Sequence, residues 1–455
     1  MSIDPADPTA ASQTPEMPDF TISRLDGPMR VSPLVPGGGH EATTGFVNDD
    51  ARIVFDPRMR SIRAAFDKNT EPPSMEVAGP RDEIFFDPRE VRAAIVTCGG
   101  LCPGINDVIR GIVMQLHYRY RVKEVVGIRY GYSGLVPRIG EPPLTIKPAM
   151  VENIHREGGT FLGSSRGPQD PKEIVDFIER QRLDILFTIG GDGTQRGALD
   201  IAGEVEQRGL PVSVIGIPKT IDNDISYVER SFGFNTAVST AKDVLSTGHE
   251  EARGAFNGVA VVKLMGRHSG FIAAMAAVAN GDANYVLIPE VPFDIEGEKG
   301  LLAHLEKRLE ERRHALVVVA EGAGQDILET DESSIRHDAS GNRVLADIGV
   351  YLRDRIAREF SSGWNAATVK YIDPSYVIRS SPANADDSIF CAKLAHNAVH
   401  AAMSGRTKMI VSLWNNTFTH VPMAAVISKR KQIDPTGPEW LSVLETTGQP
   451  VSMKN

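Results

Sequence analysis

Two aspartates lie two positions apart in the segment Ile217–Ile225, which reads IPKTIDNDI and opens on an apolar run. A carboxylate in a dry site is costly unless it has a partner or a task. Phosphoryl transfer uses one carboxylate to accept the proton of the attacking hydroxyl and another near the metal. Asp222 and Asp224 are candidates for these roles, and Lys219 and Thr220 could contact the migrating group. The alternative is a solvated acidic turn.

A glycine-rich loop, FTIGGDGTQRGA, occupies residues 187–198 between a predicted strand and a predicted helix. Gly191 and Gly193 clear space for a nucleotide, and Thr194 follows them. Asp192, among backbone donors and phosphates, is well placed to hold Mg²⁺ through water. The alternative is an aspartate that only caps the next helix.

A second glycine-rich loop, TCGGLCPG, occupies residues 97–104 and contains Gly100. Glycines between a strand and a helix let backbone N–H groups approach a phosphate, whose charge the helix N-terminus favours. The loop matches neither a dinucleotide fingerprint nor a Walker A sequence, so a simple tight turn stays open as the alternative. The cysteines, Cys98, Cys102 and Cys391, form neither a disulfide framework nor a zinc-binding pattern.

The elements that must position these loops are short Val/Ile-rich runs alternating with amphipathic stretches. Such runs indicate parallel strands covered on both faces, and ligands bind at the carboxyl ends of such strands. From Ile105 to Leu116 the apolar residues lie on one helical face. The runs are residues 93–98, 125–130, 185–190, 212–217, 259–265, 285–290 and 315–322. The sequence therefore predicts an α/β fold with two doubly wound lobes and mainly parallel sheets. Residues 1–90 are expected to form an N-terminal extension with a disordered start.

Composition excludes some functions. The 455 residues include 49 Lys and Arg against 59 Asp and Glu, a net charge of −10. An acidic chain without basic runs argues against nucleic acid and anionic membranes as partners. No apolar stretch reaches the ~18 residues of a membrane span, and the first thirty residues lack a targeting pattern. A cytoplasmic location is expected.

The loops together resemble the 6-phosphofructokinase family, in particular its plant and trypanosomatid ATP-dependent branch. The resemblance runs from about residue 80 to about residue 425. Eight motifs occur in family order: TCGGLCPG, GGTFLGSSRG, IGGDGTQRGA, PKTIDND, RSFGFNTAV, VKLMGRHSGFIA, AEGAGQD and KYIDPSYVIRS. The resemblance implies an ATP-binding lobe of residues 91–233 and 378–428, and a fructose 6-phosphate-binding lobe of residues 234–377 and 429–455.

The resemblance also implies catalytic roles. Asp222 matches the general base that takes the proton of the 1-hydroxyl of fructose 6-phosphate, and Asp224 matches the aspartate that supports base and metal. Asp192 matches the metal-linked aspartate, and Thr220 lies beside the transferred phosphoryl group. Arg166 matches an arginine that contacts the nucleotide phosphates and offsets transition-state charge. Donor binding is further expected of Gly100, Gly191, Gly193, Thr194 and Lys219.

On the sugar side, Met265, Gly266 and Arg267 match a segment that lines the site, and Glu321 matches an acid that binds sugar hydroxyls. Lys370, Tyr376 and Arg379 match groups around the 6-phosphate, for which an arginine fork suits a dianion. Surface ion pairs or ordinary packing are the alternatives. Many relatives have an arginine that enters a neighbouring subunit's sugar site where this chain has Gly258. The family resemblance implies a homotetramer or homodimer.

Two positions bear on the phosphoryl donor. Pyrophosphate-using relatives usually carry a second aspartate after GGD, where this chain has Gly193; they also carry the lysine that is present here as Lys219. A carboxylate beside a phosphate is both a steric block and a charge clash, whereas a lysine helps any polyphosphate. ATP with Mg²⁺ is therefore predicted, giving fructose 1,6-bisphosphate. A pyrophosphate-dependent enzyme and an inactive regulatory subunit are the alternatives.

Overall fold

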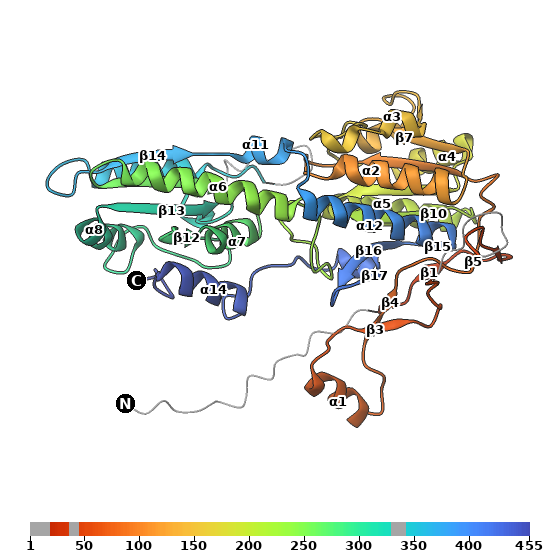
Figure 1. The fold of residues 1–455 in the computed structure, drawn as a ribbon, viewed down its shortest axis with the longest axis horizontal. Coiled ribbons are helices and arrows are strands. Elements are labelled where there is room, and N and C mark those ends of the chain that lie inside the picture. The colour runs from red at the N-terminus through yellow and green to blue at the C-terminus, as the bar shows by residue number, and fades with distance from the viewer. Residues whose placement is uncertain (1–18, 36–44, 329–342) are drawn as a thin grey trace.

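The computed structural model describes residues 19–35, 45–328 and 343–455. These residues form two α/β lobes that lie side by side along the long axis of the molecule (Figure 1). The expected disordered start of the chain lies outside the described residues.

The larger lobe is built on a nine-stranded sheet in the order β3-β4-β17-β16-β10-β9-β6-β7-β8. Its five central strands, from β16 to β7, run parallel, whereas the strands at both edges pair antiparallel. The strands are β3 (Arg52–Val54), β4 (Ser74–Val77), β6 (Arg92–Thr97), β7 (Glu124–Ile128), β8 (Leu144–Thr145), β9 (Ile185–Gly190), β10 (Ser213–Pro218), β16 (Met409–Trp414) and β17 (Thr417–Pro422).

Helices cover both faces of this sheet because its strands are apolar on both sides. In β6, Ala93 and Ile95 belong to the core under α2 and α12, whereas Ala94 and Val96 belong to the core under α4 and α5. The helices are α2 (Ile105–Met114), α3 (Pro148–Val151), α4 (Pro171–Gln181), α5 (Asp192–Gln207), α12 (Ala385–Met403) and α13 (Met423–Val426). The helix predicted from Ile105 ends at Met114, and its apolar face continues to Leu116 in a π-helical turn.

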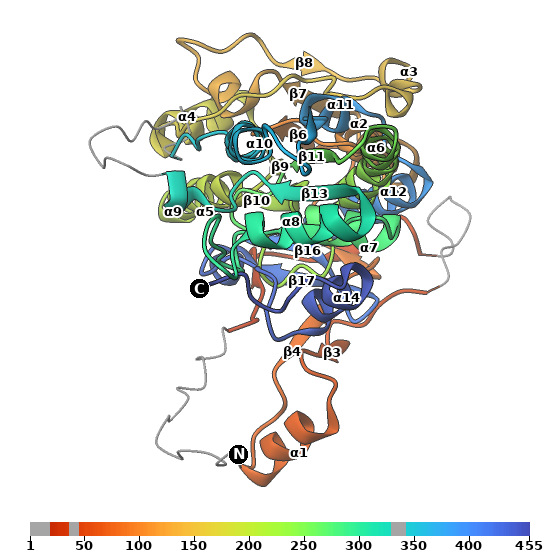
Figure 2. The same ribbon diagram turned by 90° about the vertical axis from the view of Figure 1, so that its left-hand side faces the viewer.

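The smaller lobe has a parallel four-stranded sheet in the order β12-β13-β11-β14. Helices α6 and α7 cover one face, and α8 and α10 cover the other (Figure 2). The elements are β11 (Gly258–Leu264), β12 (Tyr285–Leu287), β13 (His314–Ala320), β14 (Thr368–Ile372), α6 (Phe234–Arg253), α7 (Phe271–Asn280), α8 (Leu301–Arg312), α9 (Gln325–Leu328), α10 (Ile348–Glu359), α11 (Ser375–Ser380) and α14 (Pro438–Thr447).

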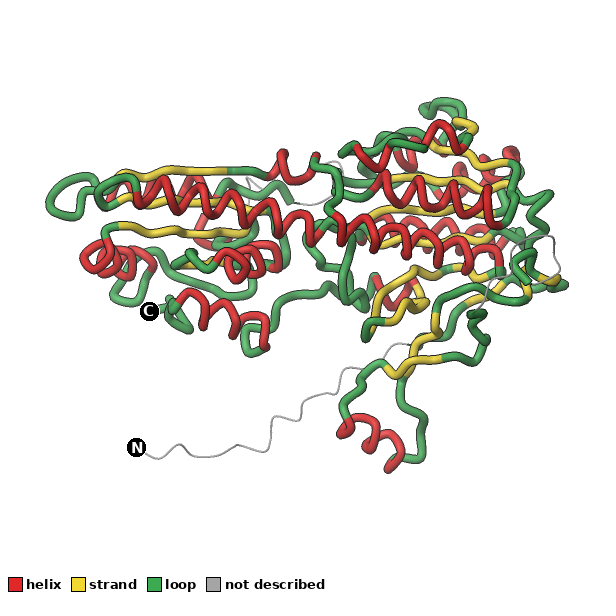
Figure 3. The backbone as a smooth tube through the Cα atoms, viewed as in Figure 1, coloured by secondary structure: helices red, strands yellow, loops and turns green. Residues whose placement is uncertain are grey.

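These two sheets confirm the predicted fold class of two doubly wound lobes. Figure 3 shows each group of strands flanked by helices, with loops gathered where the two groups meet. The loops after β6, β9 and β10 belong to the larger lobe, and those after β11, β13 and β14 belong to the smaller lobe. The glycine-rich and acidic motifs therefore come from the carboxyl ends of strands, as the sequence predicts.

The N-terminal extension takes part in the larger sheet. Its strands β3 and β4 form an edge hairpin that pairs with β17, and helix α1 (Met59–Asp67) at its tip stands away from the body (Figure 1). Two further antiparallel strand pairs involve the extension. Strand β1 (Ser23–Arg24) pairs with β15 (Arg406–Thr407), and β2 (Arg30–Val31) pairs with β5 (Glu83–Ile84).

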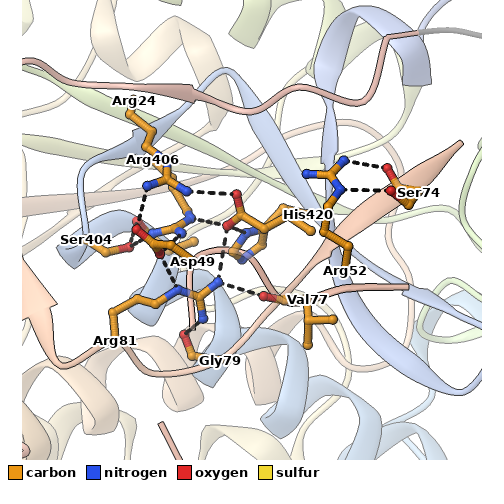
Figure 4. Close-up of polar contacts among 12 residues, drawn as sticks. Arg24, Asp49, Arg52, Ser74, Val77, Gly79, Arg81, Ser404, Arg406 and His420 are labelled. Carbon is orange, nitrogen blue, oxygen red and sulfur yellow. Dashed lines mark hydrogen bonds and ion pairs between the residues drawn. The ribbon is translucent and has the colours of Figure 1, made fainter. Parts of the chain in front are cut away.

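A buried ionic network fastens this extension to the C-terminal part of the sheet (Figure 4). Glu76 of β4 is almost fully buried and pairs with Arg81 and Arg406, and His420 Nδ1 lies 2.9 Å from its carboxylate. Asp49 pairs with the same two arginines, at 2.9 Å and 2.7 Å. Removing one member of such a network leaves a buried charge uncompensated, so the extension is an integral part of this lobe.

Candidate active site

The acidic turn after β10 is fixed by its own side chains. Thr220 Oγ1 donates to Asp224 Oδ1 at 2.7 Å and accepts from the backbone N–H of Asp222 at 3.3 Å. Asn223 has a left-handed backbone (φ 56°), and its Oδ1 accepts from Ser231 N at 3.0 Å. The turn therefore presents Asp222 and Asp224 in one defined arrangement instead of as a solvated loop.

Asp222 has an unusual environment for a carboxylate. Its Oδ1 atom is buried and has no hydrogen-bond partner among the described residues. Burial, followed by the nearby charges of Asp224 and Glu321, raises the pKa of Asp222 to about 8. A buried carboxylate oxygen without a partner, with a raised pKa, can accept a proton from a hydroxyl group placed against it.

The glycine-rich loop after β6 contacts Lys219, the residue that follows β10. Lys219 is buried, and its Nζ donates to the carbonyl oxygen of Gly100 at 2.7 Å. Burial lowers the pKa of this ammonium group, and the charge of Arg166 lowers it further. A Cβ atom at Gly100 would lie 3.3 Å from Arg166 Nη2, so a bare backbone leaves room for this guanidinium group. The structure thus brings two cations together at the loop predicted to bind phosphate.

The GGD loop continues directly into helix α5. Gly191 is the N-cap, Asp192 lies in the first turn, and the Thr194 side chain is buried against the end of β9. A Cβ atom at Gly193 would have nothing within 4 Å, so this position faces open space. The arrangement presents an acidic helix N-terminus with an unobstructed approach.

A residue absent from the sequence prediction, Arg430, lies between the two acidic loops. Its guanidinium nitrogens are 3.7 Å from Asp192 Oδ2 and 3.6 Å from Asp224 Oδ2. The neighbouring Lys431 N–H donates to the carbonyl oxygen of Asp224 at 3.0 Å, which holds this C-terminal segment against the acidic turn. Three consecutive basic residues, Lys429, Arg430 and Lys431, follow the last strand of the sheet; they indicate a cationic segment but not which carboxylates it contacts.

The carboxylates suit a metal that arrives with a phosphorylated ligand. Within the described residues, no three His, Cys, Asp or Glu side chains gather as a protein-only metal site. Mg²⁺ is usually held by one or two carboxylates together with substrate phosphates and water. Asp192 meets this requirement because its side chain is partly exposed beside the open space at Gly193.

In the smaller lobe, the loops after β11 and β13 add residues to the site formed by the acidic turn and the glycine-rich loops. Ser269 Oγ donates to the carbonyl oxygen of Asp222 at 3.3 Å, which joins the two lobes. Gly266 has φ 131°, and a Cβ atom there would lie 2.5 Å from Ser269 O, so glycine is required. The N–H of Gly322 donates to Gly266 O at 3.0 Å, which places Glu321 beside Met265, itself fully buried. Arg267 follows on the same loop and is half-buried.

The three residues expected around the sugar 6-phosphate are placed differently from one another. Arg379 is near enough to Asp222 for its charge to oppose the rise in the pKa of that carboxyl. Tyr376, on α11, is 81% exposed. Lys370 pairs with Glu251 of α6 at 3.5 Å, two residues before the end of its strand. This chain therefore brings Arg379 to the cluster and leaves Tyr376 and Lys370 on the surface.

Gly258 is the first residue of β11 and cannot accept a side chain in this backbone. A Cβ atom there would lie 2.1 Å from the carbonyl oxygen of Ala252. Nearby Arg253 is exposed and pairs with Glu250 at 3.3 Å. The position that carries an arginine in many relatives is therefore a close backbone approach here.

Comparison with solved structures places this fold among the phosphofructokinases. The pyrophosphate-dependent phosphofructokinase from Marinobacter aquaeolei matches with a TM-score of 0.65 at 19% identity, over 78% of this chain and 91% of that chain. Phosphofructokinase from Saccharomyces cerevisiae matches with a TM-score of 0.60 at 22% identity, over 79% of this chain and 47% of that chain. At these identities the similarity shows the fold alone.

Sequence comparison shows the family. The phosphofructokinase family model matches residues 92–402. The ATP-dependent 6-phosphofructokinase of Borreliella burgdorferi is 49% identical over 445 residues, 96% of this chain and 98% of the relative. The enzyme so named from Trypanosoma brucei brucei is 45% identical over 433 residues, 94% and 87% of the two chains. This chain belongs to the phosphofructokinase family, which confirms the resemblance drawn from its motifs. None of the helices in the described part of the chain is long and apolar enough to cross a membrane.

Proposed function

We propose that this protein transfers the γ-phosphoryl group of ATP to the 1-hydroxyl of fructose 6-phosphate, giving fructose 1,6-bisphosphate and ADP. One observation carries the proposal: the buried, unpartnered Oδ1 of Asp222, in a chain 49% identical to an ATP-dependent 6-phosphofructokinase. In this mechanism Asp222 accepts the proton of the 1-hydroxyl as that oxygen attacks phosphorus. Asp224 holds Thr220 in place beside the transferred group through their 2.7 Å hydrogen bond.

Two cations of the site act on the phosphoryl donor, whereas the aspartates act on the attacking hydroxyl and the metal. Arg166 and Lys219, which meet at Gly100, face the donor phosphates and offset the charge that develops on the transferred group. Mg²⁺ bound to ATP would be held by Asp192 and would neutralise phosphate charge. Thr194 and Gly191 shape the backbone around these phosphates.

Gly193 supports ATP as the donor. The open space in front of this position leaves room for a nucleotide, and an aspartate there would direct a negative charge into the same space. Lys219 is compatible with either donor because its ammonium group can bind a phosphate oxygen of ATP or of pyrophosphate. The presence of Lys219 therefore does not distinguish the two donors, and an assay with each of them does.

The two lobes divide the substrates. We propose that residues 91–233 and 378–428 bind ATP, and that residues 234–377 and 429–455 bind fructose 6-phosphate. Met265, Gly266, Arg267 and Glu321 line the sugar site, and Arg379, on the helix α11 that spans the boundary between the two segments, binds the 6-phosphate. Lys370 and Tyr376 would join it only in a different arrangement of their side chains or in an assembled homotetramer or homodimer. A cytoplasmic location stays a prediction.

The test is a direct assay of both donors. Purified protein, fructose 6-phosphate and Mg²⁺ are mixed with ATP or with pyrophosphate, and fructose 1,6-bisphosphate is measured. Turnover with ATP alone supports the proposal. Turnover with pyrophosphate alone would retain Asp222 as the base and refute the argument from Gly193. Turnover with neither would refute the assignment and favour a regulatory subunit. The Asp222→Asn variant is the control for contaminating kinase activity.

A further inference from the structure

Lys263 forms a shielded ionic cluster at the carboxyl end of β11. Its side chain is 13% exposed, and its Nζ lies 2.8 Å from Asp347 Oδ2 and 3.0 Å from Asp373 Oδ2. The hydroxyl of Tyr371 donates to Asp347 at 3.2 Å. One lysine thus joins two carboxylates from segments that precede different helices.

The two carboxylates have separate structural tasks. Asp347 caps α10, because its Oδ1 accepts from Val350 N at 3.1 Å. Asp373 follows β14, and its Oδ1 accepts from the backbone N–H and the hydroxyl of Ser375, the first residue of α11. Helix α11 carries Arg379, whose charge acts on Asp222. Lys263 is therefore connected to Arg379 through Asp373 and one short helix.

Both the charge and the packing of Lys263 favour a fixed position. Burial disfavours its ammonium charge, but hydrogen bonds to Asp347 and Asp373 outweigh burial and raise its pKa above the usual range. A Cβ atom at Gly349 would lie 3.0 Å from Lys263 Cβ and 2.4 Å from Tyr371 Cε2, so the backbone of α10 packs closely here. The lysine has little freedom to leave its partners.

We propose that Lys263 is a positioning residue of the sugar-phosphate site, which holds the start of α11 so that Arg379 faces the 6-phosphate of the substrate. The inference rests on the proposed function, since it concerns the same sugar phosphate. Strand β11 would then have two roles, because it positions Lys263 and leads directly into Met265 of the sugar site. A role in folding stability alone would leave the affinity of a folded variant for fructose 6-phosphate unchanged.

The experiment compares Lys263→Met, Lys263→Arg and Lys408→Met by steady-state kinetics and by calorimetric binding of fructose 6-phosphate. Lys408 is a matched control, because its Nζ pairs with Glu206 at 2.6 Å and its side chain is 20% exposed, in the other lobe. Lys263→Met should raise KM and Kd for fructose 6-phosphate by ~10- to 100-fold, the size expected when a charge-assisted hydrogen bond to the phosphate is lost. KM for ATP should change less than twofold. Lys263→Arg should restore most of the affinity, and Lys408→Met should match the wild type.

Two aspartate variants keep the test decisive if Lys263→Met does not fold. Asp373→Asn retains the oxygen that accepts from Ser375 but weakens the contact to Lys263, and it should raise KM for fructose 6-phosphate. Asp347→Asn leaves the Asp373 contact intact and should have a much smaller effect. Unchanged sugar-phosphate affinity in both Lys263→Met and Asp373→Asn would overturn the inference. A wild-type protein without fructose 6-phosphate turnover would instead overturn the proposed function.

Discussion

Substituting Gly193 by aspartate tests the donor argument through a single added charge. A Cβ atom at this position has nothing within 4 Å, so the new side chain displaces no protein atom. Gly193 is exposed in the first turn of α5, where a negative charge is favoured by the helix dipole. The variant should therefore fold with a melting temperature equal to or slightly above that of the wild type.

The expected loss of ATP affinity follows from Coulomb's law. Two unit charges about 4 Å apart interact by ~1 kcal/mol in bulk water and ~4 kcal/mol at the effective dielectric constant near a protein surface. The position is exposed, so an intermediate value of ~2–3 kcal/mol is expected, which corresponds to roughly 30- to 150-fold weaker binding. Affinity for pyrophosphate should fall much less if this smaller donor avoids the new carboxylate.

The assay measures KM for ATP and, by calorimetry, Kd for a non-hydrolysable ATP analogue. Gly193→Asn is the matched control, because asparagine has nearly the same shape without the charge. A large loss in both variants would indicate a steric effect, whereas a loss confined to Gly193→Asp indicates charge. Wild-type ATP affinity in a folded Gly193→Asp protein would refute the reasoning that places the donor phosphates here.

Three further predictions concern the acidic cluster. Asp222→Asn should lower kcat by ~10²- to 10⁴-fold, because the proton acceptor is lost, with nearly unchanged binding of both substrates; a kcat within threefold of wild type would contradict its role as the base. Because burial raises the pKa of Asp222, its basic form is depleted as pH falls, so kcat/KM should decline below about pH 8 in a stopped-time assay, and a profile flat from pH 6 to 9 would contradict this. Arg430→Met should weaken nucleotide binding by roughly 3- to 10-fold, since a 37% exposed cation then no longer offsets Asp192 and Asp224; Arg430→Lys should lie between, and equal Kd values by calorimetry would exclude this role.

Local pattern was sufficient for the strands and for the loops that follow them. The apolar run before Lys219 predicts a buried strand, and β10 ends at Pro218, directly before it. Because the loops TCGGLCPG, IGGDGTQRGA and PKTIDND come at the ends of the parallel strands β6, β9 and β10, their convergence could be predicted from the strand ends without knowing the sheet order. Lys219, Asp222 and Asp224 could be predicted as site residues because they come just after the end of β10.

Contacts between segments far apart in the sequence could not be predicted from the sequence alone. Arg430 reaches Asp224 because the chain returns to the acidic turn after completing β17, and no local pattern encodes that return. Lys370 has the residue type for a phosphate site, but its side chain pairs with Glu251 of α6. The strands β3 and β4 are too short to be identified by periodicity, and their partner β17 lies at the other end of the sequence.

That partnership has a consequence for how the protein is made. Glu76 and His420 are separated by 344 residues. At a synthesis rate of ~5–20 residues per second, strand β4 leaves the ribosome roughly 17–70 s before its partner strand exists. During that interval the carboxylate of Glu76 has neither Arg406 nor His420, and the hairpin has no sheet to join. The edge of the larger sheet is therefore completed after nearly the whole chain has been translated, so in a ribosome-bound nascent chain β1 and β4 wait for β15 and β17 while the parallel strands assemble.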